Sequence, residues 1–297
     1  LAGQLGLEPL PFDAEPNGIA ALKIVQPMSG PATVAFSFTT SGTSINADGS
    51  VDLTASHFLD GQLDITASSG DIEPYLVMNG VVLPQTGSGL PVALRAKAVI
   101  DAASVRLEDI DGKIDRNGLS GMLVLDRAAP TLKGSGSLTF DTIDLAWLAE
   151  GILGPVEATD GQGFNPSALG IPTRDNAALN IRLAAEQFWT GLYEPVEHFN
   201  AALNWTGGGL SLDDLAGDWL GGSLAGRLKL ANAEGNGLLE ARLKLSGADV
   251  SRILWAGAEG PVAAGTADMT LALDASGKSV ASMLRPQAAR AKCRSKD

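Results

Sequence analysis

Apolar and polar residues alternate with a period of two along most of the chain. The clearest runs are 34–38 (VAFSF), 179–183 (LNIRL) and 269–273 (MTLAL). In a β-strand this alternation places aliphatic side chains on one face and polar side chains on the other. Buried parallel strands are apolar throughout, so the pattern predicts antiparallel strands with one covered face.

Turn-forming pairs interrupt these runs. The pairs 48–49 (DG), 117–118 (NG) and 236–237 (NG) tolerate positive φ and predict hairpin turns. The glycine content, 36 of 297 residues, also disfavours long helices. We therefore predict a mainly β fold: a long, twisted antiparallel meander, built from repeats, curving into a groove and carrying short helices at the repeat ends.

The chain also repeats itself. A shift of 105 residues superimposes one block on another without a gap. The matching segments are 105–112 with 210–217, 119–125 with 224–230, and 138–140 with 243–245. A fainter copy runs from Ile45 to Leu76. Such repeats indicate modules that stack by extending one sheet.

Each copy ends in a short segment with helical spacing, and each segment begins at an aspartate. The three aspartates are Asp71, Asp144 and Asp249. An aspartate side chain accepts hydrogen bonds from the first free amides of a helix. We predict one short helix after each of them, resting on the sheet because so short a helix is unstable alone.

These patterns divide the chain into five parts. We expect an N-terminal β-rich repeat region with the faint copy, a β-repeat with a short helix, a Gly/Pro-rich loop, a second clear β-repeat, and a basic tail that is disordered. Their bounds are 1–100, 101–150, 151–176, 177–284 and 285–297.

Composition excludes several functions. The net charge of −13 argues against nucleic-acid binding and against electrostatic docking on an anionic membrane surface. A single cysteine, Cys293, excludes a disulfide within the chain and a cysteine-based zinc site. No stretch is apolar for long enough to form a membrane-spanning helix, and we interpret the chain as a fragment of a longer protein.

No catalytic pattern emerges. The two histidines, His57 and His198, lack partners at ligand spacing, and no nucleophile elbow is present. The acidic pairs Asp109/Asp111 and Asp213/Asp214 do not follow a calcium-loop spacing and predict solvated positions. The Gly runs lack the Gly-Lys-Ser/Thr of a phosphate loop. We expect no enzyme activity, no cofactor and no metal.

Five tryptophans are scattered along the chain from residue 147 onward, at positions 147, 189, 205, 219 and 255. Exposed together they would mark a sugar-stacking site or interface anchors. Because they are widely separated in the sequence, packing in the core and at sheet edges is the favoured interpretation.

The block 210–284 resembles the C-terminal region of AsmA-family proteins. The resemblance rests on 212–217 (LDDLAG), 221–230 (GGSLAGRLKL) and 243–250 (LKLSGADV), followed by the strand 269–273 and the turn around Gly277. It covers about 75 residues well, and the 105-residue copy extends it more loosely. The further Gly-rich strand expected after 279–284 is replaced by the basic tail.

The resemblance implies a protein of Gram-negative bacteria, anchored in the inner membrane and facing the periplasm. It implies an apolar β-groove that carries phospholipid or another acyl-chain lipid in outer-membrane biogenesis, with envelope proteins as further partners. The groove residues would be the inward aliphatic side chains of the two clear copies. These are Leu123, Leu125, Leu138, Phe140, Leu228, Leu230, Leu243 and Leu245.

Two interpretations of the aliphatic stripe stay open on the sequence alone. It is either the closed core of a covered sheet or an exposed trough, and the small amount of predicted helix favours the trough. Two other functions also remain. One is a structural or adaptor β-module that assists outer-membrane protein assembly through a sheet edge. The other is a secreted carbohydrate-binding or β-solenoid protein.

Overall fold

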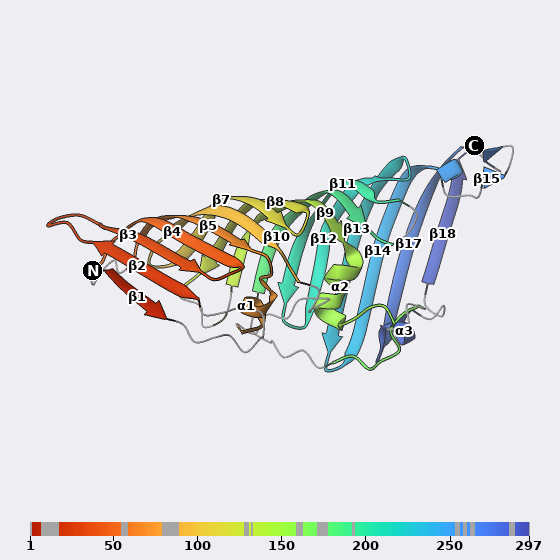
Figure 1. Cartoon of the computed structure of the whole chain (residues 1–297). Coiled ribbons are helices and arrows are strands. Elements are labelled where there is room, and N and C mark those ends of the chain that lie inside the picture. Colours follow the sequence, from red (N-terminus) through yellow and green to blue (C-terminus); the bar gives the residue numbers. More distant parts are fainter. Residues whose placement is uncertain are drawn as a thin grey trace. The chain divides into compact units, whose positions relative to one another are not determined.

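A computed structural model gives the fold (Figure 1). It describes residues 2–6, 18–54, 59–78, 89–127, 131, 133–158, 163–170, 178–191, 194–252, 256–257, 260–261, 265–284 and 289–296. The chain forms two compact units, unit 1 (Leu1–Thr139) and unit 2 (Phe140–Asp297). The division falls inside one strand, β9 (Lys133–Asp144), and not in the loop 151–176 where the sequence suggested a boundary.

Unit 1 is an antiparallel meander in which each strand pairs with its neighbour in the chain. One short helix, α1, follows its fifth strand among the residues described. The elements are β1 (Ala2–Gly6), β2 (Ile19–Val25), β3 (Ala32–Thr39), β4 (Thr43–Val51), β5 (Gly61–Ser69), α1 (Glu73–Met78), β6 (Val92–Ile100), β7 (Ser104–Ile114) and β8 (Asn117–Asp126).

Unit 2 repeats this plan with longer strands. Its meander consists of β10 (Ala178–Trp189), β11 (Val196–Thr206), β12 (Gly209–Trp219), β13 (Gly222–Ala233), β14 (Asn236–Asp249), β17 (Thr266–Gly277) and β18 (Ala289–Lys296). A small hairpin, β15 (Ala256–Gly257) with β16 (Gly260–Pro261), stands outside the main sheet. The helical elements are α2 (Leu145–Leu153), η1 (Val250–Arg252) and α3 (Val280–Met283).

The predicted fold class is confirmed: the chain is mainly β, a meander of antiparallel strands with a few short helices. The predicted turn positions are wrong. Gly49 lies inside β4, and the two NG pairs begin β8 and β14. The hairpins turn two residues earlier, at 115–116 and 234–235, where Asp115 and Glu234 adopt positive φ of 54° and 51°. These non-glycine residues take the left-handed conformation that the sequence assigned to the NG pairs.

The 105-residue repeat is a structural repeat. Strands β7, β8 and β9 correspond to β12, β13 and β14. Both copies carry a bulge with an aspartate at positive φ, Asp109 (52°) and Asp214 (51°), in equivalent strands. Both also carry a glycine with φ near the mirror-β region, Gly121 (144°) and Gly226 (159°). A Cβ on either glycine would overlap a carbonyl oxygen of the next strand, so only glycine fits this close approach.

The three predicted helix starts are also confirmed. The Asp144 Oδ1 atom accepts a hydrogen bond from the Ala146 amide at 2.7 Å and caps α2. The corresponding bonds join Asp71 Oδ1 to the Glu73 amide (3.0 Å) and Asp249 Oδ1 to the Ser251 amide (2.9 Å). The expected continuation of the third helix, at 253–254, lies outside the described residues.

The basic tail was predicted to be disordered, but part of it forms a strand. Its residues 289–296 form β18, which pairs antiparallel with β17 from Leu273 to Thr266. The Gly/Pro-rich loop is irregular in its described part after α2, apart from one bridge between Glu157 and Phe164.

Three segments cover one end of the apolar face of unit 2. Helix α2 packs on β13, and its Gly151 lies against the ring of Trp205. Helix α3 packs on β14 and β17, and the Ala281 amide donates to the carbonyl of Asn165. The segment 163–170 joins the cover through the amide of Leu169, which donates to the carbonyl of Lys278 at 2.9 Å.

Asn232 connects this cover to the sheet. It is buried, and its Nδ2 atom donates to the carbonyls of Ile152 (3.2 Å) and Gly170 (2.8 Å). Its Oδ1 atom accepts from the amide of Gly235 at 3.0 Å. One side chain therefore joins α2, the segment after it and the β13–β14 turn.

We expect Asn232→Ala to destabilise unit 2 by about 2–4 kcal/mol, because it removes three hydrogen bonds and leaves buried partners unsatisfied. Urea unfolding followed by tryptophan emission measures this, since all five tryptophans lie in unit 2. The control is Asn236→Ala, an exposed asparagine of the same hairpin, which should change stability little. Equal losses from the two variants would contradict this role for Asn232.

Candidate functional site

The candidate site is the apolar face of unit 1. Strand register places its side chains in rows that cross the meander. One row contains Ile24, Val34, Gly49, Leu63, Ala98, Leu107 and Leu123. The next rows on either side run from Leu22 through Phe36 to Ile65, and from Val51 through Ile100 to Leu125. The alternation in the sequence therefore builds one continuous aliphatic surface.

This face is only half-buried. Its large side chains with intermediate exposure are Ile24, Val34, Phe36, Phe38, Ile45, Leu63, Ile65, Leu94, Ile100, Val105, Leu107, Leu123, Leu125 and Leu138. Helix α1, the one helix described in unit 1, contacts one end of the face, where Tyr75 lies edge-on to Phe38 at 6.2 Å. Fully buried side chains such as Ile110 and Leu119 are the minority.

The eight residues predicted from the resemblance form four pairs related by the 105-residue repeat. In most pairs the two members differ in how deeply they are buried. Leu123, Leu125, Leu138 and Phe140 are all half-buried. Their partners in the second copy are Leu228 (8% exposed), Leu230 (4%), Leu243 (half-buried) and Leu245 (3%). Leu228, Leu230 and Leu245 are therefore core residues, while Leu243 keeps partial exposure.

The groove residues predicted from the sequence all lie between positions 123 and 245. The structure adds Val34, Phe36, Leu63 and Ile65 to the same face. Their signal was present in the period-two alternation of 34–38 and 63–65. They were not predicted as groove residues because those predictions came from the two clear copies of the repeat, 105–145 and 210–250.

Over β5 to β7 the opposite face of unit 1 is polar. Asp64, Thr66, Arg95, Lys97 and Asp111 alternate with the aliphatic side chains and surround a shallow, open depression of about 540 Å³. The guanidinium of Arg95 already lies 2.9 Å from the carboxylate of Asp111, and both side chains are more than half exposed. Solvent screens such pairs, so the depression lacks the buried polar groups of a built ligand site.

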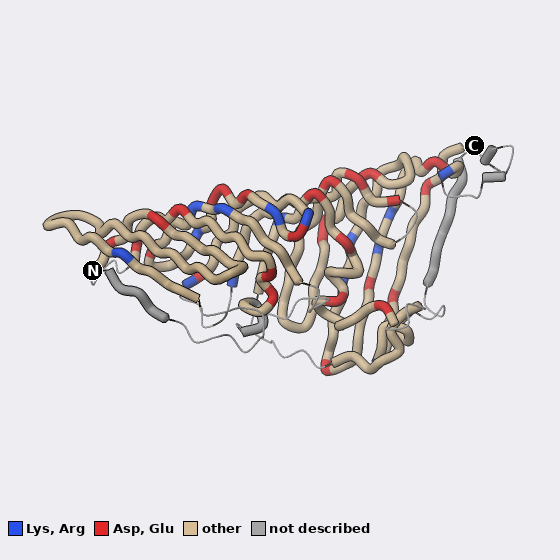
Figure 2. The backbone as a smooth tube through the Cα atoms, in the orientation of Figure 1, with Lys and Arg blue, Asp and Glu red and all other residues tan. Residues whose placement is uncertain are grey.

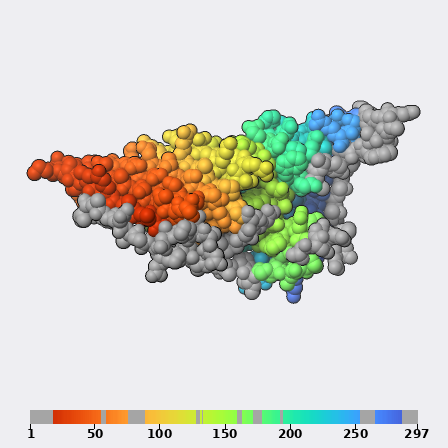
Figure 3. All heavy atoms as spheres, in the orientation of Figure 1, coloured from red at the N-terminus to blue at the C-terminus, as the bar shows by residue number. Residues whose placement is uncertain are grey.

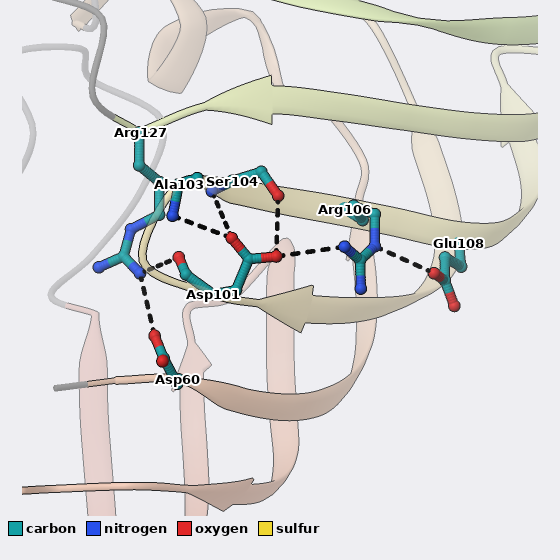
Figure 4. Close-up of polar contacts among 7 residues, drawn as sticks. All are labelled: Asp60, Asp101, Ala103, Ser104, Arg106, Glu108 and Arg127. Atoms are coloured by element: carbon teal, nitrogen blue, oxygen red, sulfur yellow. Dashed lines mark hydrogen bonds and ion pairs between the residues drawn. The ribbon is translucent and has the colours of Figure 1, made fainter. Parts of the chain in front are cut away.

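A second polar cluster closes the β6–β7 turn (Figure 4). The Asp101 carboxylate accepts from the amides of Ala103 (2.9 Å) and Ser104 (2.8 Å) and from Nη1 of Arg106 (3.1 Å). The amide hydrogen bonds, Ala103 first, hold the pKa of Asp101 below its ordinary value. Arg127 reaches the carbonyl of Asp101 from the end of β8. The cluster fixes the turn between β6 and β7.

Of the two acidic pairs, Asp109, Asp213 and Asp214 lie in bulges, whereas Asp111 is in regular register with Ser120. Asp109 is exposed, and the Asp213 carboxylate accepts hydrogen bonds from Asn204 and Ser211. Among the described residues no group of three or more His, Cys, Asp or Glu side chains could hold a metal ion. In the same part of the chain no helix has the length and apolar character needed to cross a bilayer.

The four tryptophans that the structure describes do not converge. Trp205 packs against Gly151, and Trp219 Nε1 donates to the carbonyl of Glu194 at 2.9 Å. Trp147 and Trp189 are exposed at separate positions, on α2 and at the end of β10. Trp255 lies outside the described residues, as does His57.

His198 forms an exposed ion pair. It lies at a bulge of β11 with φ of 50°, and its Nδ1 atom is 2.9 Å from Oδ2 of Asp218. That hydrogen bond raises the pKa of His198 above its ordinary value, and Glu186 and Glu197 add electrostatic attraction. The pair stabilises unit 2 below the ordinary histidine pKa, and this contribution is lost as the pH rises through the raised pKa.

NMR titration of the imidazole protons should therefore give His198 a pKa above the ordinary 6.5. Asp218→Asn should lower it, and His57→Gln assigns the signal, since the chain has two histidines. An unchanged pKa in Asp218→Asn would contradict the assigned cause.

Comparison with known proteins does not assign the chain to a family. No family model matches the chain, and neither a curated protein nor a solved structure matches it. The resemblance of 210–284 to the AsmA family therefore stays a prediction from the sequence.

Proposed function

We propose that unit 1 binds lipid acyl chains along its apolar face. The observation that supports this most strongly is the set of aliphatic rows that cross β2 to β8 with their side chains half-buried. A surface of this kind in water is favoured to be covered by an apolar partner. Acyl chains suit it because each buried CH₂ contributes about 0.8 kcal/mol and needs no polar partner.

The lipid headgroup would stay in water at the open side of the face. The rows contain aliphatic and aromatic side chains and glycine, with polar partners such as Thr43 and Ser69 confined to the α1 end, where their hydroxyls pair at 2.7 Å. Recognition would therefore act on the chains and not on headgroup chemistry. Binding would be passive, with no cofactor and no catalysed reaction.

The cellular setting rests on the resemblance to the AsmA family. On that basis we propose that the chain is the periplasmic part of an inner-membrane-anchored envelope protein that conveys phospholipid. Outer-membrane biogenesis and lipid homeostasis are the processes it would serve.

A titration with cis-parinaric acid, whose fluorescence rises in an apolar environment, tests acyl binding. We expect saturable binding that phospholipid reverses and glycerophosphocholine, which has the headgroup without the chains, does not. Absence of saturable binding by the folded protein would refute the proposal. Competition by glycerophosphocholine would show headgroup recognition instead and would also refute it.

A further inference from the structure

Among the residues of unit 1 that the structure describes, large exposed apolar side chains gather on the β2–β3 hairpin. Ile19, Leu22 and Val25 on β2 are 54%, 41% and 52% exposed, and Met28 in the loop is fully exposed. Leu22 belongs to the apolar face, whereas Ile19 and Val25 lie on the other face. Apart from Lys23, the second face of β2 is therefore apolar, unlike that of β5, which carries Gln62, Asp64 and Thr66.

This hairpin also lacks acidic residues. Residues 16–47 contain no Asp or Glu and one basic residue, Lys23, although the chain has 34 acidic residues in total. The tip of the hairpin is tan at the left end of Figure 2, while acidic residues recur along the later strands. A surface without negative charge meets no electrostatic barrier at a phospholipid headgroup layer.

The loop at the tip has a defined shape. Gln26 Nε2 donates to the carbonyls of Gly30 (3.1 Å) and Pro27 (3.3 Å), and Gly30 turns the chain with φ of 93°. This closure leaves Met28 projecting into solvent. In Figure 3 the hairpin forms a projecting end of unit 1. Pro27 and Pro31 have no backbone N–H, so fewer donors would lose water on insertion into lipid.

We propose that this hairpin docks on a zwitterionic phospholipid bilayer, with Val25 and Met28 inserted among the lipids. A bilayer fits better than a protein partner because the tip offers apolar side chains without charged groups to specify a register. The tip is also continuous with the apolar face, because Ile24 and Val34 flank the loop and begin the row that leads to Leu63. Transfer of acyl chains along that row rests on the proposed function; docking itself does not.

Flotation with phosphatidylcholine vesicles tests docking. We expect the wild-type chain to float and Met28→Asp to lower the vesicle-bound fraction about tenfold, since an apolar anchor becomes a charge. Met122→Asp is the matched control: Met122 is 41% exposed on the polar face of β8, and this change should leave flotation unaltered.

Three results would overturn the proposal: no flotation of the wild-type chain, flotation of Met28→Asp at the wild-type level, or equal losses in both variants. Titration with cis-parinaric acid in the absence of vesicles separates the two proposals. Met28→Asp should bind the probe like the wild-type chain, and loss of probe binding would show an effect on the face and not on docking. Probe binding without flotation would refute docking and leave the acyl-binding proposal standing.

Discussion

Leu228→Glu should unfold unit 2. The Leu228 side chain is 8% exposed and pairs across the strands with Leu212, which has no exposed surface, and with Ala241. A carboxylate at this position would lose its hydration without gaining a partner, so we expect a loss of at least about 4 kcal/mol. Urea unfolding followed by tryptophan emission reports unit 2 alone, because unit 1 contains no tryptophan.

The control for this change is Arg227→Glu. Arg227 is exposed beside Leu228 and faces Arg242 on β14, so the new charge should be neutral or slightly favourable. If Leu228→Glu kept the wild-type unfolding midpoint, Leu228 would not lie in a closed core of unit 2. The two copies would then both be open, as the resemblance implied.

The equivalent change in the first copy should have the opposite outcome. Leu123 precedes Leu228 by 105 residues and is half-buried. We expect Leu123→Glu to leave the unfolding of unit 2 unchanged and to weaken cis-parinaric acid binding by about tenfold to a hundredfold. The loss arises because a charge in an aliphatic row must be desolvated when an acyl chain covers it.

Met122→Glu controls for the added charge. Met122 is the adjacent residue on β8 but lies on the polar face, where a carboxylate stays in water. The Met122→Glu variant should bind cis-parinaric acid with the affinity of the wild-type chain. Equal weakening by the two variants would mean that the acyl chains do not lie on the aliphatic face.

Most of the fold follows from local pattern. Period-two alternation identified the strands, and the 105-residue shift identified β7 to β9 with β12 to β14. The caps at Asp71, Asp144 and Asp249 were predicted because each needs only a side chain within two residues of a free amide. The turns were misplaced because Asp115 and Glu234 adopt the left-handed conformation in preference to the NG pairs that follow them.

The degree of burial could not be read from the same pattern. Leu123 and Leu228 occupy identical positions in the alternation, yet one is half-buried and the other belongs to the core. The difference depends on tertiary packing, to which α2, α3 and the segment pinned by Asn232 contribute in unit 2. Contacts between segments so far apart in the chain are not encoded in strand periodicity.

The tip of the β2–β3 hairpin was overlooked for a related reason. Its exposed apolar residues look like ordinary strand residues in the sequence. Only the structure separates Val25 and Met28 from the strands around them. The absence of acidic residues over 16–47 was the available sequence signal.

Site-specific photo-crosslinking tests whether acyl chains lie on the apolar face of unit 1. A photoreactive residue replaces Leu123, Met122 or Leu228 in turn, and the protein is irradiated with phosphatidylcholine vesicles and analysed by mass spectrometry. We expect lipid adducts at position 123, few at position 122 on the polar face, and few at position 228 in the core. Adducts at 122 and 123 in equal yield, or at neither position in a folded chain, would contradict acyl-chain binding by the apolar face of unit 1.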